Sequence, residues 1–295
     1  MSDSIAGLRR KIESAGDLQA VVRTMKAMAA SSIGQYETSV RALSDYYQAV
    51  ELGLGACFRK SEPVGPMATF KPHYEAGPTR AIIFGSDQGL VGRFNDAVVE
   101  YAIKSLEGAP DGIEVWAVGE RAQTRLVDEG LPLLGWFAVP NSLQAITLLV
   151  GRIATEIETH RDQKENSALW VFYNRPKGGA FYESTGQRLL PLDEEWRQGL
   201  TRDPWPTANL PEVMGSDNTT MRALLREYLF ISLFRACAES LASENASRLA
   251  AMQRADKNIS DLLEQLNGDY HQLRQSSIDE ELFDVVSGFE ALVRI

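Results

Sequence analysis

Cysteine is scarce in this sequence of 295 residues, which contains two, Cys57 and Cys237. Two cysteines cannot form a disulfide framework or a cysteine-rich metal site, so we expect reduced and buried thiols. The first residues contain no apolar segment typical of signal peptides, and no run of about 18 apolar residues occurs anywhere in the chain. These absences favour a cytosolic protein that does not itself cross a membrane.

An excess of positive charge is also missing, because the formal net charge is -10 and the isoelectric point is about 5.0. A nucleic-acid partner would require a basic surface, so we expect none. The three histidines, His73, His160 and His271, share no local motif, and the Asp-Glu-Glu runs at 193–195 and 279–281 are typical of solvated charge. Since no nucleophile stands beside a base, we expect no catalytic residue, no metal and no cofactor.

Helix breakers are absent between Gly215 and Gly268. The apolar and small residues there recur in alternating steps of three and four, which is typical of a coiled-coil helix. The same repeat runs from Leu8 to Leu54, where two internal glycines each weaken a helix by about 1 kcal/mol against alanine without ending it. We therefore predict two long helical domains, at residues 1–60 and 216–293.

The middle of the chain has a different pattern. Four β-rich runs alternate with helical segments, and a probable edge strand follows them; the runs are TRAIIFG, IEVWAVG, LPLLGWFAV and SALWVFYN, and the edge strand lies near GQRLLPL. Such alternation indicates βαβ units and a parallel sheet covered on both faces. Segments rich in proline and glycine flank this region. The fold class is therefore α/β, with a doubly wound, Rossmann-like domain at residues 77–210 and a long antiparallel coiled coil.

The two long helices must run antiparallel if they pair, because the central domain holds both at its own surface. Cys57 and Cys237 then fall at corresponding depths of the pair. The second helix is the longer, so at 1.5 Å per residue it should extend beyond the first by roughly 20 to 30 Å. An apolar stripe lies on that overhang and predicts a protein partner; its members are Ile278, Leu282, Val285, Val286, Phe289 and Leu292.

Three stretches carry a family resemblance: TMKAMAAS at 24–31, SDQGLVGRFN at 86–95, and the pair ESLASENASRLAAM and RQSSIDEEL near the C-terminus. In that order, they resemble the Met-rich N-terminal segment, the Ser-Asp-Arg-Gly-Leu-Cys-Gly turn and the C-terminal signature of the gamma subunits of F-type ATP synthases. The chain is similar to a divergent member, because it reads GDLQAVV at 16–22 where the family has Asn-Thr-x-Lys-Ile-Thr, and Asp279 where Thr is common.

The resemblance implies a noncatalytic rotor shaft, which couples ion-driven rotation of a membrane ring to ATP synthesis or hydrolysis. The implied partners are three alpha and three beta subunits for each gamma, the epsilon subunit and the c-subunit ring, at the cytoplasmic face of the inner membrane. The implied contacts to alpha and beta are Met25, Lys26, Glu244, Arg248, Gln275, Ile278 and Leu282, and the glycine turn contains Ser86, Asp87, Gly89 and Gly92.

These residues also have ordinary structural interpretations. Met25 at a heptad position can be a core residue and Lys26 a solvated charge, while Glu244 and Arg248 have the spacing of a surface pair worth about 0.3 kcal/mol. A run of small residues would let the two helices approach closely and leave a slim rod; these are Ala236, Ala238, Ala242, Ser243, Ala246, Ser247, Ala250 and Ala251.

Two other functions stay open at this point. The glycine turn follows a strand and opens a helix, where a doubly wound fold binds phosphate, so the chain could be a nucleotide-binding enzyme. Its spacing matches neither G-x-G-x-x-G nor a Walker A sequence. Alternatively, the chain could be a coiled-coil scaffold with a degenerate α/β domain, in which polar Arg235, Asn245 and Asp256 fix the helix register.

Overall fold

The computed structural model describes most of the chain and divides it into two compact units. We call Met1–Ala29 with Leu249–Ile295 the terminal unit and Ala30–Arg248 the central unit. The described residues are 4–60, 78–109, 112–161, 168–178, 181–192, 194–202, 205–209, 211–212 and 217–293.

Two long helices begin and end the chain, α1 (Ile5–Lys60) and α6 (Asp217–Val293), and each runs through both units. Neither Gly16 nor Gly34 interrupts α1, as the heptad pattern predicts. The elements between them belong to the central unit; they are β1 (Thr79–Phe84), α2 (Phe94–Leu106), β2 (Ile113–Val118), α3 (Glu120–Asp128), β3 (Leu133–Phe137), α4 (Leu143–Arg161), β4 (Leu169–Gly178), β5 (Phe181–Leu190) and α5 (Glu194–Arg202).

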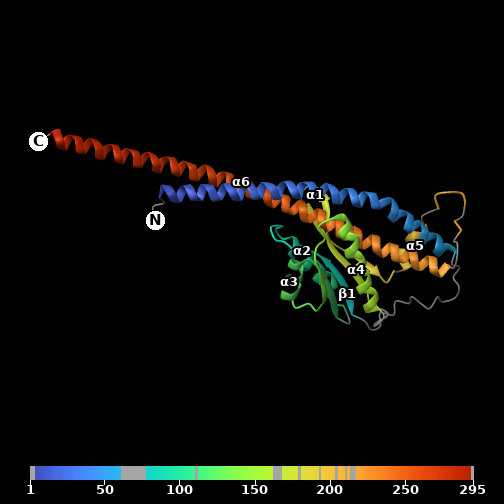
Figure 1. Cartoon of the computed structure of the whole chain (residues 1–295). Helices are drawn as coiled ribbons and strands as arrows, with labels where there is room; N and C mark the ends of the chain where they lie inside the picture. The colour runs from blue at the N-terminus through green and yellow to red at the C-terminus, as the bar shows by residue number, and fades with distance from the viewer. Residues whose placement is uncertain are drawn as a thin grey trace. The chain divides into compact units, whose positions relative to one another are not determined.

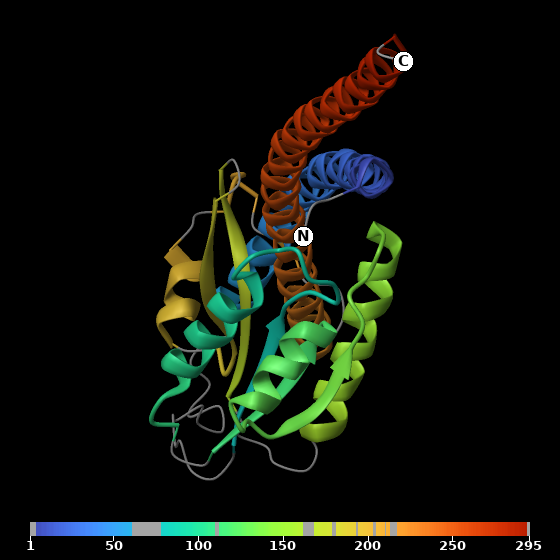
Figure 2. The ribbon, with the colours of Figure 1, turned by 90° about the vertical axis from the view of Figure 1, so that its left-hand side faces the viewer.

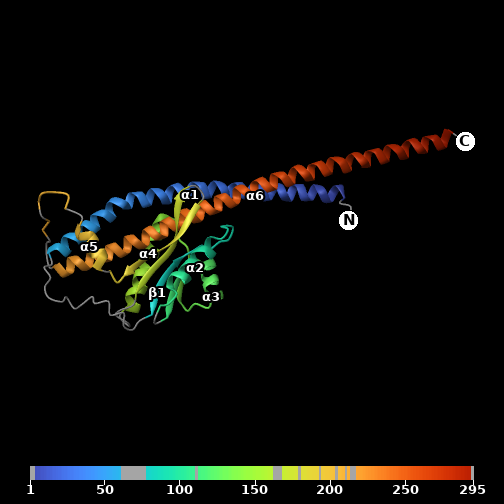
Figure 3. The same cartoon turned by 180° about the vertical axis from the view of Figure 1, so that it is seen from behind.

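In the terminal unit, α1 and α6 lie side by side and run antiparallel (Figures 1 and 3). Their shared core consists of buried residues at heptad spacing from both helices, with Val22 from α1 and Met252 from α6 among the most buried. Polar bonds set the register, since Gln19 donates to Ser260 at 2.8 Å and Arg23 pairs with Asp256.

That register places the start of α1 opposite about residue 274 of α6. The remaining 19 or so residues of α6 extend past α1 for about 28 Å at 1.5 Å per residue, and the two chain ends in Figure 1 mark this difference. The overhang predicted from the sequence is therefore confirmed.

The sheet of the central unit has the strand order β3-β2-β1-β4-β5. The first four strands pair in parallel, and β5 pairs antiparallel with β4 at one edge. The expected edge strand is thus present but makes the sheet mixed, because a short connection joins it directly to β4, and such a hairpin cannot place two strands parallel.

Helices cover both faces of this sheet. Side chains alternate along β1, so Ala81 and Ile83 pack with α2 and α3 on one face, while Ile82 and Phe84 pack with α4 and α6 on the other. Figure 2 shows β3 between α3 and α4. The doubly wound α/β fold expected from the alternating pattern is confirmed.

Within the central unit, α6 is enclosed by its neighbours over residues 231–244, where every residue except Arg235 is buried. The face formed by Ala236, Ala238 and Ala242 contributes to the core that contains the inner strands and α4. Small side chains here therefore let α6 fit between α1 and the sheet, whereas the sequence had suggested a slim rod.

Both cysteines are buried thiols outside any disulfide, as expected. They do not lie at corresponding depths of the helix pair, so that expectation is wrong. Cys237 lies near Tyr36, whose phenol pKa is raised by burial and by this thiol, whereas Cys57 lies much farther along α1. The register follows the packing of Tyr47 against Tyr228, with ring centroids 5.9 Å apart.

Candidate functional site

The glycine turn, residues 85–92, lies at the carboxyl end of β1 and leads into α2. Ser86 is fully buried and bonded to Asn95 twice, because its backbone N–H donates to Oδ1 at 2.9 Å and its Oγ accepts from Nδ2 at 2.8 Å. The Ser86 hydroxyl in turn donates to the carbonyl oxygen of Gln88. These bonds hold the turn in one conformation, and they pair the backbone N–H and the hydroxyl of Ser86 with groups of the protein itself.

The glycines of this turn have different structural roles. At Gly85 a Cβ atom would clash with Ala122 of α3, so the close approach requires glycine. Gly92 has a φ of 62°, in the left-handed region that favours glycine, whereas Gly89 has open space around it. Leu90 also has a positive φ, of 64°, although its side chain is 61% exposed. A leucine held in this region is a strained residue that the sequence alone did not identify.

Asp87 connects the ends of three strands. One carboxylate oxygen accepts the backbone N–H of Glu120, the first residue of α3, at 3.0 Å, and the other accepts the N–H of Val139 after β3 at 2.9 Å. The glycine turn opens α2, the helix start that the sequence suggested for a phosphate. Asp87 binds the amide at the start of a different helix, α3, so it places a fixed carboxylate within the glycine turn and does not itself occupy the start of α2.

Glu244 and Arg248 form an ion pair of 2.6 Å between successive turns of α6. Their side chains are 6% and 13% exposed, so the interpretation as a surface pair is wrong, because the fold buries this face of α6. Burial raises the pKa of Glu244, the Arg248 guanidinium opposes that rise, and the negative charge of Asp87 adds to it. The structure thus brings Glu244 close to the glycine turn.

Met25 and Lys26 belong to the terminal unit. Met25 is partly buried and packs against the core shared by α1 and α6, as expected for a heptad position. The ammonium nitrogen of Lys26 lies 3.0 Å from Oδ2 of Asp256, and Nε of Arg23 lies 3.2 Å from Oδ1 of the same carboxylate. Lys26 is therefore half of an ion pair between the helices, and the interpretation as a solvated charge is wrong.

Of the three polar heptad residues, Asp256 bonds across to Arg23 and Lys26 of α1. Arg235 pairs with Glu239 of its own helix, and Asn245 donates to the carbonyl oxygen of Leu241, also in α6. Spacing alone cannot separate these cases, since a polar side chain at a heptad position can fold back on its own backbone.

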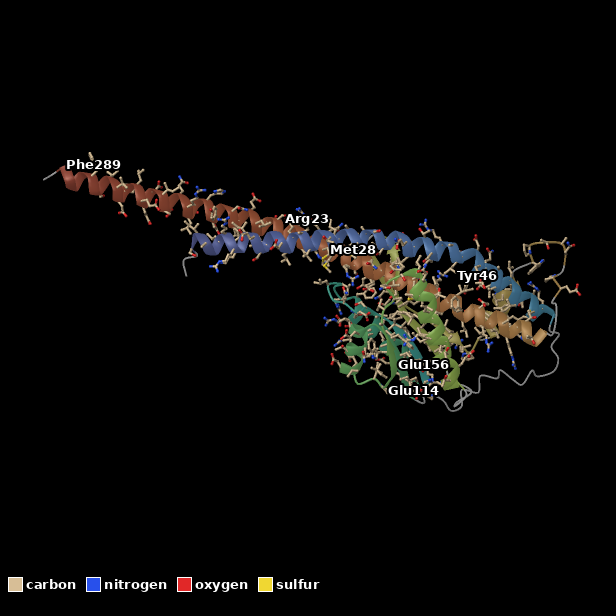
Figure 4. The ribbon with its side chains drawn as sticks, viewed as in Figure 1. Arg23, Met28, Tyr46, Glu114, Glu156 and Phe289 are labelled. Carbon is tan, nitrogen blue, oxygen red and sulfur yellow. The ribbon has the colours of Figure 1, made fainter. Side chains whose placement is uncertain are left out.

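Gln275, Ile278 and Leu282 lie on exposed turns of α6 in the terminal unit. We call the exposed apolar residues at the end of α6 the tip stripe, with exposed fractions from 47% to 72%; they are Ile278, Leu282, Phe283, Val285, Val286 and Phe289. Figure 4 shows Phe289 near the end of the helix. The side chain of Leu292 lies outside the described residues. The structure does not bring Lys26 and Gln275 together, because the helix register separates them along α6.

The central unit also contains a charge cluster, centred on the buried carboxylate of Glu239, that the sequence did not reveal. The Glu239 carboxylate lies 2.7 Å from Nε of Arg235 and 3.3 Å from Nε of Arg175, which comes from β4. The spacing of Arg235 and Glu239 could have predicted the first pair. No local signal points to Arg175, because only the packing of the sheet on α6 brings it there.

A family model described as ATP synthase matches residues 4–292 of this chain. The ATP synthase gamma chain of Paramagnetospirillum magneticum is 27% identical over 296 residues, which cover 98% of this chain and 99% of that protein. The ATP synthase gamma chain of Paracoccus denitrificans is 26% identical, with coverage of 98% and 99%. This chain belongs to the ATP synthase gamma-chain family. Family membership confirms the resemblance carried by the three sequence stretches.

Solved structures share the fold. A chain of the Euglena gracilis mitochondrial ATP synthase, in the structure of its OSCP, F1 and c-ring in rotational state 3, superposes with a TM-score of 0.65 at 18% identity. The match covers 98% of this chain and 94% of that chain. A chain of the rotor of the same enzyme gives a TM-score of 0.62. The gamma-chain fold is therefore retained here despite low identity.

The described part of this gamma-chain family member has neither a membrane-spanning helix nor a cluster of metal-ligating side chains. None of its helices is both long and apolar enough to span a bilayer. No group of three or more His, Cys, Asp or Glu side chains in that part is arranged to hold a metal ion.

Proposed function

We propose that this chain is the noncatalytic central shaft of an F-type ATP synthase, turning within a ring of three alpha and three beta subunits. Its α/β domain would contact the epsilon subunit and the c-subunit ring at the cytoplasmic face of the inner membrane, to which the chain is peripheral. Rotation of the shaft couples ion flow to ATP synthesis or hydrolysis in the surrounding subunits. The single observation that carries this proposal is the tip stripe.

The tip stripe supports a sleeve-like partner because its apolar residues follow one another along about three turns of α6 with no partner from α1. Contiguous exposed apolar surface of this kind is uncommon on monomeric proteins and marks interaction sites. Its exposed members lie around more than one side of the helix, since Val285 and Val286 are adjacent and both exposed. A partner that surrounds the helix covers such a surface, whereas a flat partner covers one side.

Rotation also needs contacts whose free energy differs between orientations of the shaft. Such coupling is reciprocal, so a nucleotide that favours one orientation is itself bound more tightly in that orientation. We assign these contacts to Met25, Lys26, Arg248 and Gln275, with Ile278 and Leu282 in the tip stripe. Each of these side chains is at least partly exposed.

Glu244 has a different part in this assignment, because its side chain is buried and ion-paired with Arg248. It would hold the guanidinium in place and leave the exposed edge of Arg248 to meet a partner. Lys26 is similarly oriented by Asp256, at 3.0 Å. Both cations are thus held in fixed positions, which reduces the entropy lost when a partner binds.

Asp87 supports the noncatalytic assignment, because it places a carboxylate within the glycine turn itself. The N–H groups of Glu120 and Val139 hold that carboxylate on both oxygens, so a phosphate bound at the turn would lie beside a fixed negative charge. We therefore place nucleotide chemistry in the partner subunits.

The experiment that tests this function is deletion of residues 276–295 from a chain expressed with its own alpha and beta subunits. The truncated chain should keep its fold, because no other described residue of the chain covers the tip stripe, but should dissociate from the alpha and beta subunits at lower salt. Equal retention of the full-length and truncated chains would contradict the proposed role of the tip stripe. Alanine at Leu262, which is exposed on α6 before the overhang, provides a matched control.

A further inference from the structure

A cluster of charged side chains joins the sheet to α6 in the central unit, with a buried carboxylate between two arginines that are 40% and 46% exposed. Glu239 has a side chain that is 7% exposed and pairs through Oε1 with Arg235, one turn earlier in α6, and through Oε2 with Arg175 near the end of β4. Nη2 of Arg175 donates to the hydroxyl of Tyr173 at 3.1 Å, and its guanidinium lies over the Tyr173 ring, 5.8 Å from the centroid. The Tyr173 ring is itself buried in the core between sheet and helix.

The remainder of this contact is apolar, and much of it is made by small side chains. Leu233, Ala238 and Leu241 of α6 are among those that pack on the strands. Apolar packing favours contact but has little directional preference, so it resists separation of α6 from the sheet more than rotation or sliding of the helix. Charge-assisted hydrogen bonds are directional, and a guanidinium fixes the geometry of its partner.

Stability alone does not account for the cluster. Taking the Glu239 carboxylate out of water is costly. Its two arginine partners stay partly exposed, and ion pairs that reach solvent contribute little net stability. The best-attested role of buried ionic groups is to fix the register of packed elements. Here the packed elements are α6 and the sheet, and Arg175 is the partner supplied by the sheet.

We propose that Glu239 is the positioning residue that locks α6 to the sheet against rotation and sliding, so that rotation imposed on the α/β domain is carried into the shaft. The inference rests on the proposed function. In this arrangement the apolar contact supplies adhesion, and the link from Glu239 to Arg175 supplies torsional stiffness. If this link were less stiff, the shaft would twist elastically at the contact before the rotation reached the rest of α6.

The test uses single-molecule angular fluctuation of the assembled complex. The alpha and beta subunits are fixed to a surface, and a rod is attached to the α/β domain through Leu148→Cys on α4, where Leu148 is 72% exposed. Labelling is selective because both native cysteines are buried. In the stalled complex, the variance of the rod angle is inversely proportional to the stiffness between the rod and the sleeve.

Glu239→Gln keeps the shape of the side chain but removes its charge. The amide NH2 group cannot accept a hydrogen bond, so one of the two guanidinium contacts of Glu239 is lost and the other is weakened. The variance should therefore rise by up to about twofold, while the rate of ATP hydrolysis by the same complex is unchanged. Loss of stability alone would lower the melting temperature without widening the angular distribution of the folded complex. Arg175→Lys keeps a charge but loses the planar fork, and should give an intermediate variance.

Glu183→Gln is the matched control, since Glu183 lies on β5 next to β4 and pairs with Lys177 at 3.0 Å in an exposed position. It should leave the variance at the wild-type value. If Glu239→Gln does not assemble, the Arg175→Lys complex carries the same test, because the pair of Glu239 with Arg235 remains. A wild-type variance in the altered complexes would overturn the inference and leave the proposed function intact, whereas a wild-type chain that never assembles with alpha and beta subunits would overturn the proposed function.

Discussion

Oδ2 of Asp256 lies 3.0 Å from the ammonium nitrogen of Lys26, which joins α6 to α1 inside the terminal unit. This ion pair links two of the features that the sequence had suggested separately, a polar heptad position and a partner contact. A partner that met Lys26 would meet a cation whose charge is already shared with Asp256. The pair therefore contributes to the helix register and fixes the position from which Lys26 would meet a partner.

The first prediction concerns pH. A hydrogen bond from Lys26 is the main cause that lowers the pKa of Asp256 below its ordinary value of 3.8; burial opposes this shift, and Arg23 adds to it. Because the folded-state pKa lies below the unfolded one, the stabilisation is present above about pH 4 and is lost as pH falls through the folded value. Asp256→Asn should therefore reduce the loss of helical circular dichroism on acidification. An unchanged acid-denaturation curve would show that this pair does not stabilise the coil.

Gly85 and Gly89 make a matched pair for a test of the glycine turn. A Cβ at Gly85 would clash with Ala122 and lie 2.6 Å from Oδ1 of Asn95, whereas at Gly89 the nearest atom is 4.0 Å away. Gly85→Ala should destabilise the central unit by about 1 to 3 kcal/mol or more, as expected for overpacking. Gly89→Ala should change the unfolding free energy by less than about 0.5 kcal/mol in chemical denaturation. Equal effects at the two positions would contradict the described turn.

Asp87→Ala removes the acceptor of two backbone N–H groups, those of Glu120 and Val139. Leaving such donors unpaired should cost about 1 to 3 kcal/mol for each group that is not resolvated. Asp87→Asn retains one acceptor oxygen, so its thermal unfolding temperature should lie between those of the alanine variant and the wild type. A stable alanine variant would mean that water replaces the carboxylate at no cost.

Arg248→Ala should leave assembly intact and lower ATP turnover by the assembled complex, if Arg248 meets a partner. It also leaves the buried carboxylate of Glu244 without its cation, which should cost about 3 to 5 kcal/mol of stability. Unchanged turnover would remove Arg248 from the assigned contacts.

The double variant Glu244→Leu with Arg248→Met separates these two effects, because it removes the pair without leaving a buried charge. It should recover stability but keep the low turnover.

The pKa of Glu244 is raised by burial and lowered by Arg248, so Arg248→Ala should raise it further. When the folded-state pKa of a carboxyl group lies above its unfolded-state pKa, the protein is most stable below the unfolded-state pKa and loses stability as pH rises towards the folded-state pKa. The Arg248→Ala variant should therefore have a progressively lower melting temperature from about pH 5 to pH 8. The double variant should lack this slope.

Local patterns in the sequence predicted the elements well where a repeat was long. The heptads of α1 and α6 outweighed Gly16 and Gly34, since two weak positions cost little in a helix held by its partner. The overhang also followed from length alone, because each helical residue adds a fixed rise.

What the sequence could not predict depends on contacts between distant segments. Burial of Glu244 and Arg248 follows from packing in the central unit, and Arg175 meets Glu239 only because the sheet lies against α6. The antiparallel direction of β5 depends on its short connection to β4, which the pattern of apolar residues does not encode. The assignments of partner contacts to Met25, Lys26 and Gln275, and the three-domain division at residues 1–60, 77–210 and 216–293, stay predictions.

Under the proposed function, one copy of this chain turns inside a closed ring of larger subunits. Native mass spectrometry of the complex captured by a tagged copy from its own cells tests this most directly, because it gives both subunit identity and stoichiometry. We predict one copy of this chain for every three copies of each of two larger nucleotide-binding subunits. A chain recovered alone, or in a symmetric assembly of its own copies, would contradict it.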